Sequence, residues 1–234
     1  MSVSRLIAAA LISAATATPA SADVTLQVKV RGQMPGSVAQ DEDATEYRKG
    51  LKLRTDSTSN GVSMTTIIDL SKGRMIMLWH HSKTANVFEP KEISELFGKD
   101  NTPLVKPSIT PTTQSRQIAG WTCIVHNFKA LYSVAKLDMV PPTMVTEGTM
   151  CLVKNGPGQA DYTAFSQGAG KGAPFDPSLG VAFATEITIS FRGDEPTSGV
   201  MDWGTYTTEV SSVSTAPIPD SMFEIPADYK VTKR

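Results

Sequence analysis

Cysteine and histidine are scarce in this sequence, and neither sign of charge is in excess. The 234 residues include two cysteines and three histidines, and 22 basic residues nearly balance 23 acidic ones. This balance argues against a nucleic-acid-binding protein, which needs a basic surface. The chain also lacks the GxSxG motif of many hydrolases and the GxxxxGK[ST] loop that binds phosphates. We therefore expect a protein that is not an enzyme, needs no cofactor and binds no nucleic acid.

Long hydrophobic runs are missing too, and the clearest short one lies near the N-terminus. It covers residues 6–12, follows Arg5 and precedes the small residues Ala20, Ser21 and Ala22. A membrane-spanning helix needs about 20 apolar residues, whereas a short run between a positive charge and a small-residue site is typical of a secretory signal peptide. We interpret residues 1–22 as a signal peptide that is cleaved after Ala22. The mature protein is then expected to be periplasmic or secreted, without a stable membrane anchor.

The two cysteines, Cys123 and Cys151, both belong to the expected mature chain. In an oxidising compartment a single pair of cysteines forms a disulfide by default. A redox-active pair is the alternative, but the spacing is not CxxC and no basic residue stands beside either cysteine. We therefore predict a structural disulfide between Cys123 and Cys151.

Alternation of apolar and polar residues runs through most of the remaining chain and predicts β-strands. Residues 24–31 show it most clearly. Further strands are expected at 47–55, 62–70, 74–80, 84–88, 117–128, 144–154, 181–192 and 203–214. Loops are expected at 32–45, which holds a run of acids, and at 100–115, which holds three prolines.

Helices are few in the predicted pattern. A short amphipathic helix is expected at 90–98 and a helical turn at 160–167. So many strands with so little helix cannot be covered by helices on both faces, and the sheet must therefore curl or stack. No internal repeat or linker divides the chain. We predict a mainly β fold with a single domain over 23–234, in which a curled antiparallel sheet (a half-barrel) is covered by a short helical lid at 90–98.

Three short pieces of the sequence carry a resemblance to a known family. They are IIDL at 67–70 with Met75, Met77 and Lys83, IAGWTC at 118–123, and FEIPADYK at 223–230. In order and spacing they resemble a family of exported bacterial domains of unknown function, whose members are similar to the periplasmic lipoprotein carriers (LolA/LolB-like). The resemblance implies an antiparallel half-barrel closed by a helical lid, in the periplasm. It implies no catalytic residues, because the carriers have none.

A curled sheet under a short lid leaves a concave apolar face that suits a hydrophobic ligand. We predict a binding protein for a lipid or a lipidated partner, and the sequence does not predict its oligomeric state. The predicted ligand-binding residues come from the first strands and from the lid helix. They are Leu26, Val28, Val30, Leu51, Leu53, Ile67, Met75, Met77, Trp79, Ile93, Leu96 and Phe97.

Two other functions remain open. The same alternation is expected of a structural or envelope-interaction protein whose core is filled by its own side chains. Less favoured is a copper-binding protein, in which Met75, Met77 and one histidine, such as His80, would supply thioether and imidazole ligands. Because a methionine stripe that fills an apolar core explains the same spacing, we assign no metal site.

Overall fold

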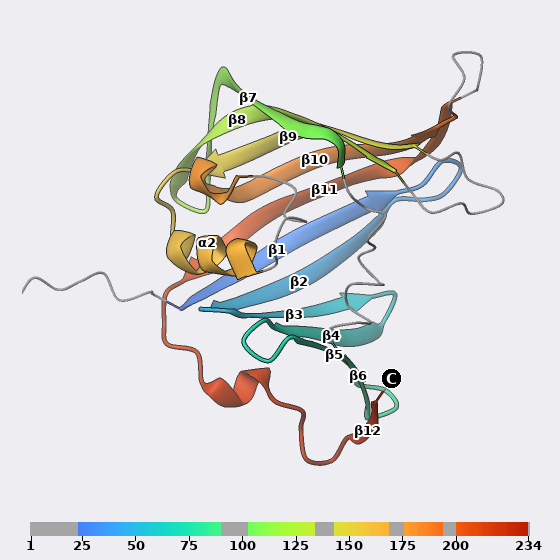
Figure 1. The fold of residues 1–234 in the computed structure, drawn as a ribbon, viewed down its shortest axis with the longest axis vertical. Coiled ribbons are helices and arrows are strands. Elements are labelled where there is room, and N and C mark those ends of the chain that lie inside the picture. The colour runs from blue at the N-terminus through green and yellow to red at the C-terminus, as the bar shows by residue number, and fades with distance from the viewer. Residues whose placement is uncertain (1–22, 90–102, 134–142, 169–175, 194–199, 234) are drawn as a thin grey trace, which may run out of the picture.

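Twelve strands form one sheet in the computed structural model, which describes residues 23–89, 103–133, 143–168, 176–193 and 200–233 (Figure 1). The strands are β1 (Val24–Gln33), β2 (Gln40–Lys49), β3 (Lys52–Ser59), β4 (Val62–Asp69), β5 (Arg74–Trp79), β6 (Thr84–Phe88), β7 (Pro103–Ile118), β8 (Trp121–Ser133), β9 (Thr143–Val153), β10 (Val181–Arg192), β11 (Val200–Ser214) and β12 (Lys230–Lys233). The helical elements are α2 (Gln159–Gly168) and the short 3-10 helices η2 (Pro177–Leu179) and η3 (Asp220–Phe223).

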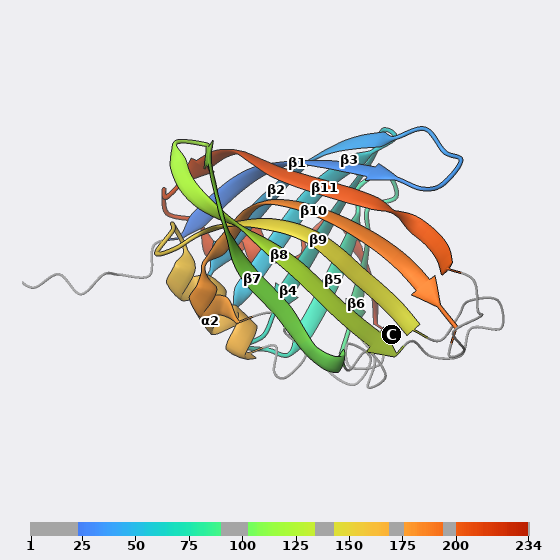
Figure 2. The ribbon, with the colours of Figure 1, turned by 90° about the horizontal axis from the view of Figure 1, so that it is seen from above.

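The strand order across the sheet is β12-β6-β5-β4-β3-β2-β1-β11-β10-β9-β8-β7. All neighbours are antiparallel, except that β12 runs parallel to β6. The sheet is twisted and curled, and α2 lies near the ends of β1 and β2 (Figures 1 and 2). The prediction of a mainly β, curled antiparallel sheet with little helix is confirmed. The helical turn expected at 160–167 is α2, whereas the signal peptide at 1–22 and the lid helix at 90–98 lie outside the described residues.

The acidic run that the sequence places in a loop over 32–45 is part of a strand, because β2 already begins at Gln40. Cations on β1 explain why a strand accepts these acids. Asp41 lies opposite Arg31, and their Oδ1 and Nε atoms are 3.7 Å apart. Opposite charges that face each other across two strands favour the pairing, so the loop prediction is wrong here.

The proline-rich segment at 100–115, predicted as a loop, contains most of β7. This strand pairs with β8 alone and forms one edge of the sheet. Proline has no N–H group to donate, which excludes it from central strands but not from an edge strand. The pairing with β8 is also interrupted by register shifts, one of them after Pro111. Such irregularities accommodate residues that cannot complete the ladder.

Two tight turns divide segments that the alternation predicts as single strands. Gly50 (φ 56°) separates β2 from β3 within the predicted strand 47–55. Ala119 (φ 49°) and Gly120 (φ 82°) connect β7 to β8 at the start of the predicted strand 117–128. Positive φ at both central residues, as in the β7–β8 turn, is one signature of a two-residue hairpin turn, whereas in the β2–β3 turn only Gly50 has a positive φ. The alternation of apolar and polar residues continues through a turn of two residues, so this pattern does not show where one strand ends and the next begins.

The chain between β11 and β12, residues 215–229, packs across one face of the β2–β6 half of the sheet, and we call it the C-terminal strap. Its Phe223 is 2% exposed and belongs to the same buried cluster as Ile67, Ile76 and Leu78, which are each 0% exposed. Figure 1 shows the strap leaving β11 and returning to the sheet at β12, beside β6. This face is therefore closed by the protein's own chain.

The predicted Cys123–Cys151 disulfide is confirmed, with an S–S distance of 2.02 Å. It joins the neighbouring strands β8 and β9, and both cysteines are buried. Leu26, Val28 and Phe183 belong to the same buried cluster. The disulfide therefore lies within the core that links β1 to the β8–β10 half of the sheet.

Candidate functional site

Cross-strand register decides which of the predicted residues share a face of β1–β6. Residues that lie directly opposite one another in neighbouring strands point to the same side of a sheet. The register gives three rows: Val24–Arg48–Leu53–Ile68–Met75–Phe88, Leu26–Glu46–Thr55–Thr66–Met77–Asn86 and Val28–Ala44–Ser57–Met64–Trp79–Thr84. These rows define one face, which we call the Met75 face. The C-terminal strap packs on the other face.

Most of the predicted ligand-binding residues lie on the Met75 face: Leu26, Val28, Val30, Leu53, Met75, Met77 and Trp79. Ile67 does not join them, because it points to the opposite face and packs with Phe223 under the strap. Leu51 stands in the turn before β3 and is 37% exposed. The lid residues Ile93, Leu96 and Phe97 lie outside the described residues. The ligand-binding role of the whole set stays a prediction.

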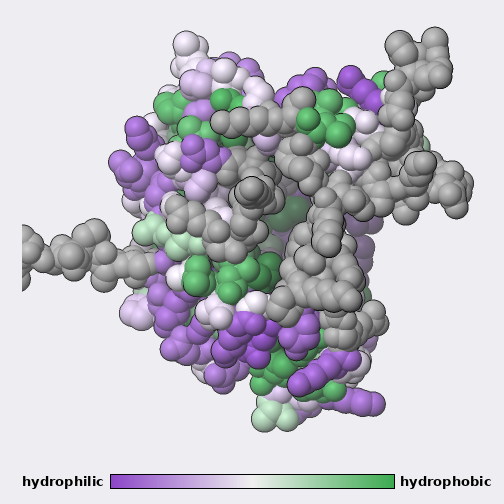
Figure 3. All heavy atoms as spheres, in the orientation of Figure 1, coloured by the Kyte–Doolittle hydropathy of each residue, from purple (hydrophilic) through white to green (hydrophobic). Residues whose placement is uncertain are grey.

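An apolar row crosses four strands of the Met75 face. Leu53, Ile68, Met75 and Phe88 lie opposite one another on β3, β4, β5 and β6. Only Met75 is buried, at 7% exposure, while its three neighbours in the row are half-buried. In Figure 3 hydrophobic surface is visible over β3 and β4 below α2. The row is the part of this face best suited to hold an apolar chain.

Ile68 and Phe88 are the members of this row that the sequence prediction missed. Ile67 and Ile68 are adjacent and both apolar, so alternation alone does not tell which of them lies on the same face as Met75. Phe88 is the last residue of β6, next to the predicted helix. The alternation of Ala85 and Val87 within the same strand places Phe88 on the other face, and this signal was available in the sequence.

The Met75 face also carries charge, on β2. Arg48 Nη2 lies 2.6 Å from Glu46 Oε2, and both side chains are largely buried. The Arg48 guanidinium stands 5.2 Å from the centre of the Tyr162 ring, a cation–π contact that ties α2 to the sheet. Burial of the ring raises the pKa of Tyr162 to about 12. The charged pair therefore separates the apolar row on β3–β6 from the apolar residues of β1.

A small cavity of about 70 Å³ lies between α2 and the hairpin that connects β2 to β3. Its lining residues are Arg48, Gly50, Lys52, Leu53, Asp161, Tyr162 and Phe165. Asp161 is 3% exposed, and burial raises the pKa of its carboxyl. Such a volume holds a water molecule or two but not an acyl chain, since ligand pockets typically reach about 300 Å³ or more.

The proposed copper ligands are not brought together. Met75 and Met77 lie on the Met75 face, whereas His80 is hydrogen-bonded on the opposite face. Its Nε2 lies 2.9 Å from Thr65 Oγ1 and its Nδ1 lies 2.6 Å from the Tyr229 hydroxyl. Both ring nitrogens are thus occupied within the protein. Within the described ranges, no cluster of three or more His, Cys, Asp or Glu side chains is arranged to hold a metal ion.

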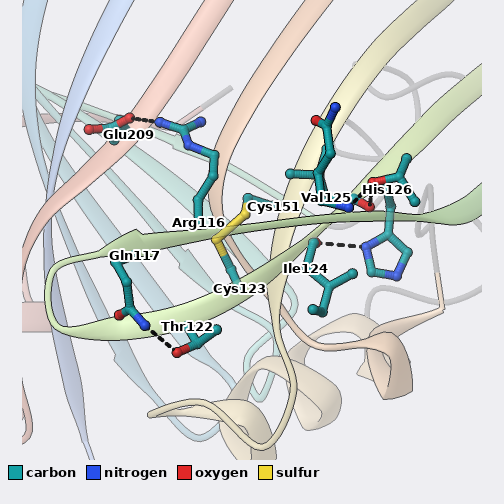
Figure 4. Close-up of a disulfide and its surroundings, with 11 residues drawn as sticks. Arg116, Gln117, Thr122, Cys123, Ile124, Val125, His126, Cys151 and Glu209 are labelled. Atoms are coloured by element: carbon teal, nitrogen blue, oxygen red, sulfur yellow. Dashed lines mark hydrogen bonds and ion pairs between the residues drawn. A yellow bond between two sulfur atoms is a disulfide. The ribbon is translucent and has the colours of Figure 1, made fainter.

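A second, larger depression was not predicted from the sequence, although its lining includes Val30, one of the predicted ligand-binding residues. It is a polar groove of about 880 Å³ lined by residues of β1, β2 and β7–β11. Cys151 of the disulfide contributes to its lining. Figure 4 shows Arg116 of β7 pointing to Glu209 of β11, with 2.6 Å between Nη2 and Oε2. The groove was missed because its lining comes from seven strands that are distant in sequence and are brought together by their order in the sheet and by the contact of β7 with β11.

No family model matches this sequence, and no curated protein matches it either. Similar solved structures include an uncharacterized conserved protein from Thermus thermophilus (10% identity, TM-score 0.42, covering 92% of this chain and 91% of that one). A LolA superfamily protein from Nitrosomonas europaea (7%, 0.35, 87% and 90%) and a DUF1329 family protein from Desulfovibrio piger (7%, 0.34, 88% and 91%) are similar too. Among the described residues no helix combines the length and apolar character that crossing a membrane requires.

Proposed function

We propose that this protein is an exported, non-enzymatic binding protein that holds a hydrophobic ligand, a lipid or a lipidated partner, on the Met75 face. The observation that carries the proposal is the apolar row of Leu53, Ile68, Met75 and Phe88, three of which keep part of their surface accessible. The opposite face of the same strands is closed by the C-terminal strap. An apolar ligand would cover the Met75 face in the way that the strap covers the opposite face.

The driving force would be burial of apolar surface, which contributes about 25 cal/mol for each Å² removed from water. Met77 and Trp79 extend the apolar row along β5, so an acyl chain could lie across several strands. The buried disulfide supports export, because such bonds persist in oxidising compartments. The alternative, a structural protein with a filled core, differs in one respect: its Met75 face would have no affinity for lipid.

The test is calorimetric titration of the purified exported protein with palmitate, together with native mass spectrometry for lipid that co-purifies. Replacing Met77→Gln keeps the size of the side chain and adds polarity to the Met75 face, so we expect binding to weaken by about 5–10-fold. Met34→Gln is the matched control, because Met34 is 49% exposed and lies in the turn between β1 and β2. Absence of both saturable binding and bound lipid would favour the structural alternative.

A further inference from the structure

The polar groove is built by the β7–β8 hairpin, which brings β7 into contact with β11 although three strands lie between them in the sheet. Gln114 and Arg116 of β7 line one side, and residues of β1, β2 and β9–β11 line the rest. The Arg116–Glu209 ion pair connects β7 to β11. The buried disulfide holds β8 to β9 beside the groove. The groove is thus shaped before any ligand arrives, which lowers the entropic cost of binding.

One row of the groove has the composition of an ammonium site. Glu186 of β10 lies directly opposite Thr149 of β9 on one side and Thr207 of β11 on the other. All three residues line the groove, and none of them forms a hydrogen bond or ion pair with another described residue that involves its side chain. Side chains directly opposite in neighbouring strands stand about 5 Å apart at Cβ. A carboxylate is therefore flanked by two hydroxyl oxygens on the same side of the sheet.

The charge of the groove also favours a cation. Its lining contains five carboxylates, from Asp41, Glu42, Asp43, Glu186 and Glu209, but three basic side chains, from Lys29, Arg31 and Arg116. All three basic side chains face carboxylates, since Arg116 pairs with Glu209, Arg31 pairs with Asp41, and Lys29 lies directly opposite Asp43 and Glu209 in the neighbouring strands. Glu186 and Glu42 are the two carboxylates of the lining that exceed the basic side chains. Grooves with an excess of one sign attract ligands of the opposite sign. An anionic ligand would meet repulsion at Glu186.

We propose that the groove binds primary amines carried on an extended chain, with Glu186, Thr149 and Thr207 receiving one ammonium group. A protonated amine has three N–H donors and no acceptor. One carboxylate oxygen and two hydroxyl oxygens can accept all three. Of the remaining carboxylates in the lining, Asp43 lies directly opposite Lys29, whereas Glu42 on β2 lies opposite Val30 and has no basic side chain directly opposite it. The row of Glu186 includes Arg31 and therefore lies on the side of the sheet opposite Val30 and the Met75 face, although Val30 also lines the groove. The amine site does not rest on the function proposed for the Met75 face.

Two ligands share this chemistry, a polyamine and a lysine-rich peptide, so the experiment uses spermidine and tri-lysine. Each is titrated into the purified exported protein by calorimetry at about 20 mM and about 200 mM salt. We expect saturable one-to-one binding that weakens as salt rises. Tighter binding of spermidine would identify a polyamine site, and tighter binding of tri-lysine would identify a peptide site. Either result supports the amine site, and the absence of saturable binding for both ligands at low salt would overturn it.

Glu186→Gln is the decisive variant, because it removes the charge and keeps the shape of an exposed side chain. We expect it to weaken amine binding by at least about 10-fold, the effect typical of losing a hydrogen bond to a charged group. Thr207→Val should weaken binding less, by about 3-fold, and gives a second measurement if Glu186→Gln disturbs folding. Asp202→Asn is the matched control, an exposed acid on β11 outside the groove lining. Equal losses in Glu186→Gln and Asp202→Asn would show non-specific charge attraction and refute the site.

Discussion

The two faces of strands β3–β6 bury their apolar residues by different means. On one face, Ile67, Ile76 and Leu78 are fully buried because the C-terminal strap covers them with Phe223. On the Met75 face, Ile68 and Phe88 remain half-buried although they lie in a row of apolar residues. On these strands the Met75 face is the more apolar one, because charged residues such as Arg54 and Asp69 point to the strap side. The difference in burial therefore comes from the covering segment and not from the composition of the sheet.

Directed hydrogen bonds hold the strap in place on its face. Lys49 Nζ donates to the carbonyl of Ile218 at 2.7 Å, and Arg54 Nη1 donates to the carbonyl of Met222 at 2.6 Å. Further along, the Tyr229 hydroxyl is hydrogen-bonded to the ring of His80. A cover fixed at so many points is part of the fold. The comparison teaches that an apolar sheet face is a candidate binding surface only after its permanent covers have been located.

The largest expected effect comes from removing the aromatic ring at the centre of the strap. Phe223→Ala should lower the free energy of unfolding by about 3–5 kcal/mol, because the ring is almost fully buried and its loss leaves a cavity. Phe88→Ala on the Met75 face is the counterpart and should cost less than half as much, since Phe88 is half-buried. Urea unfolding of both variants measures the two losses. Equal losses of unfolding free energy would contradict the proposed difference between the faces, because they would show that both faces are closed to the same degree.

The disulfide extends the comparison to the half of the sheet that the strap does not cover. Replacing both cysteines, Cys123→Ala with Cys151→Ala, should lower the unfolding free energy by about 3–4 kcal/mol, the loop-closure entropy expected for a separation of 28 residues. Urea unfolding of the double variant measures it, and reduction of the unaltered protein should reproduce the loss. A loss below about 1 kcal/mol would show that packing alone holds β8 to β9.

Local patterns were enough to predict much of this architecture. Alternation placed Met75, Met77 and Trp79 on one face of β5, and the register confirms this arrangement. The export hypothesis and the cysteine count together predicted the disulfide. These features depend on neighbours in sequence or on the number of residues of one type. They were therefore accessible without knowledge of the tertiary structure.

Three of the failures share one cause, which is dependence on distant segments. The sequence alone does not tell whether Ile67 or Ile68 faces the strap, because the strap lies about 150 residues further along the chain. Pro111 was predicted to lie in a loop, since only the strand order shows that β7 is an edge. The polar groove was missed for the same reason: Glu186 acquires its two threonine neighbours only through the pairing of β9, β10 and β11.

A smaller effect is expected where the strap is held by a single polar contact. Tyr229→Phe removes the hydroxyl that lies 2.6 Å from His80 Nδ1 and should lower the unfolding free energy by about 0.5–1.5 kcal/mol. Hydrogen exchange should speed up at 223–230 before it does so elsewhere. Tyr206→Phe, on a half-buried β11 residue, is the control with little expected change. If both variants behave alike, the hydroxyl does not fasten the strap.

The smallest expected effect is a loosening of the strap by acid. Lys83 donates to Asp228 at 2.7 Å and thereby holds the pKa of that carboxyl below its ordinary value. In the same way, Lys52 lowers the pKa of Asp220 at the start of η3. A carboxyl whose pKa is lower in the folded state stabilises the fold above its ordinary pKa, and this contribution is lost as the pH falls through the lowered value. Loosening should therefore begin below about pH 4.

Hydrogen exchange protection at 219–230, measured at pH 5 and at pH 3, tests this expectation. Protection of the strap should fall at pH 3 relative to that of β10 and β11, which are joined by the uncharged pairs Thr185–Thr208 and Thr188–Thr205. In Asp228→Asn the contact with Lys83 is already uncharged on one side, so less of the change should remain. An unchanged response in this variant would locate the acid sensitivity outside the strap. In that case Phe223 and the uncharged contacts alone would hold the strap on the sheet. The two faces would then differ only in how their apolar side chains are packed.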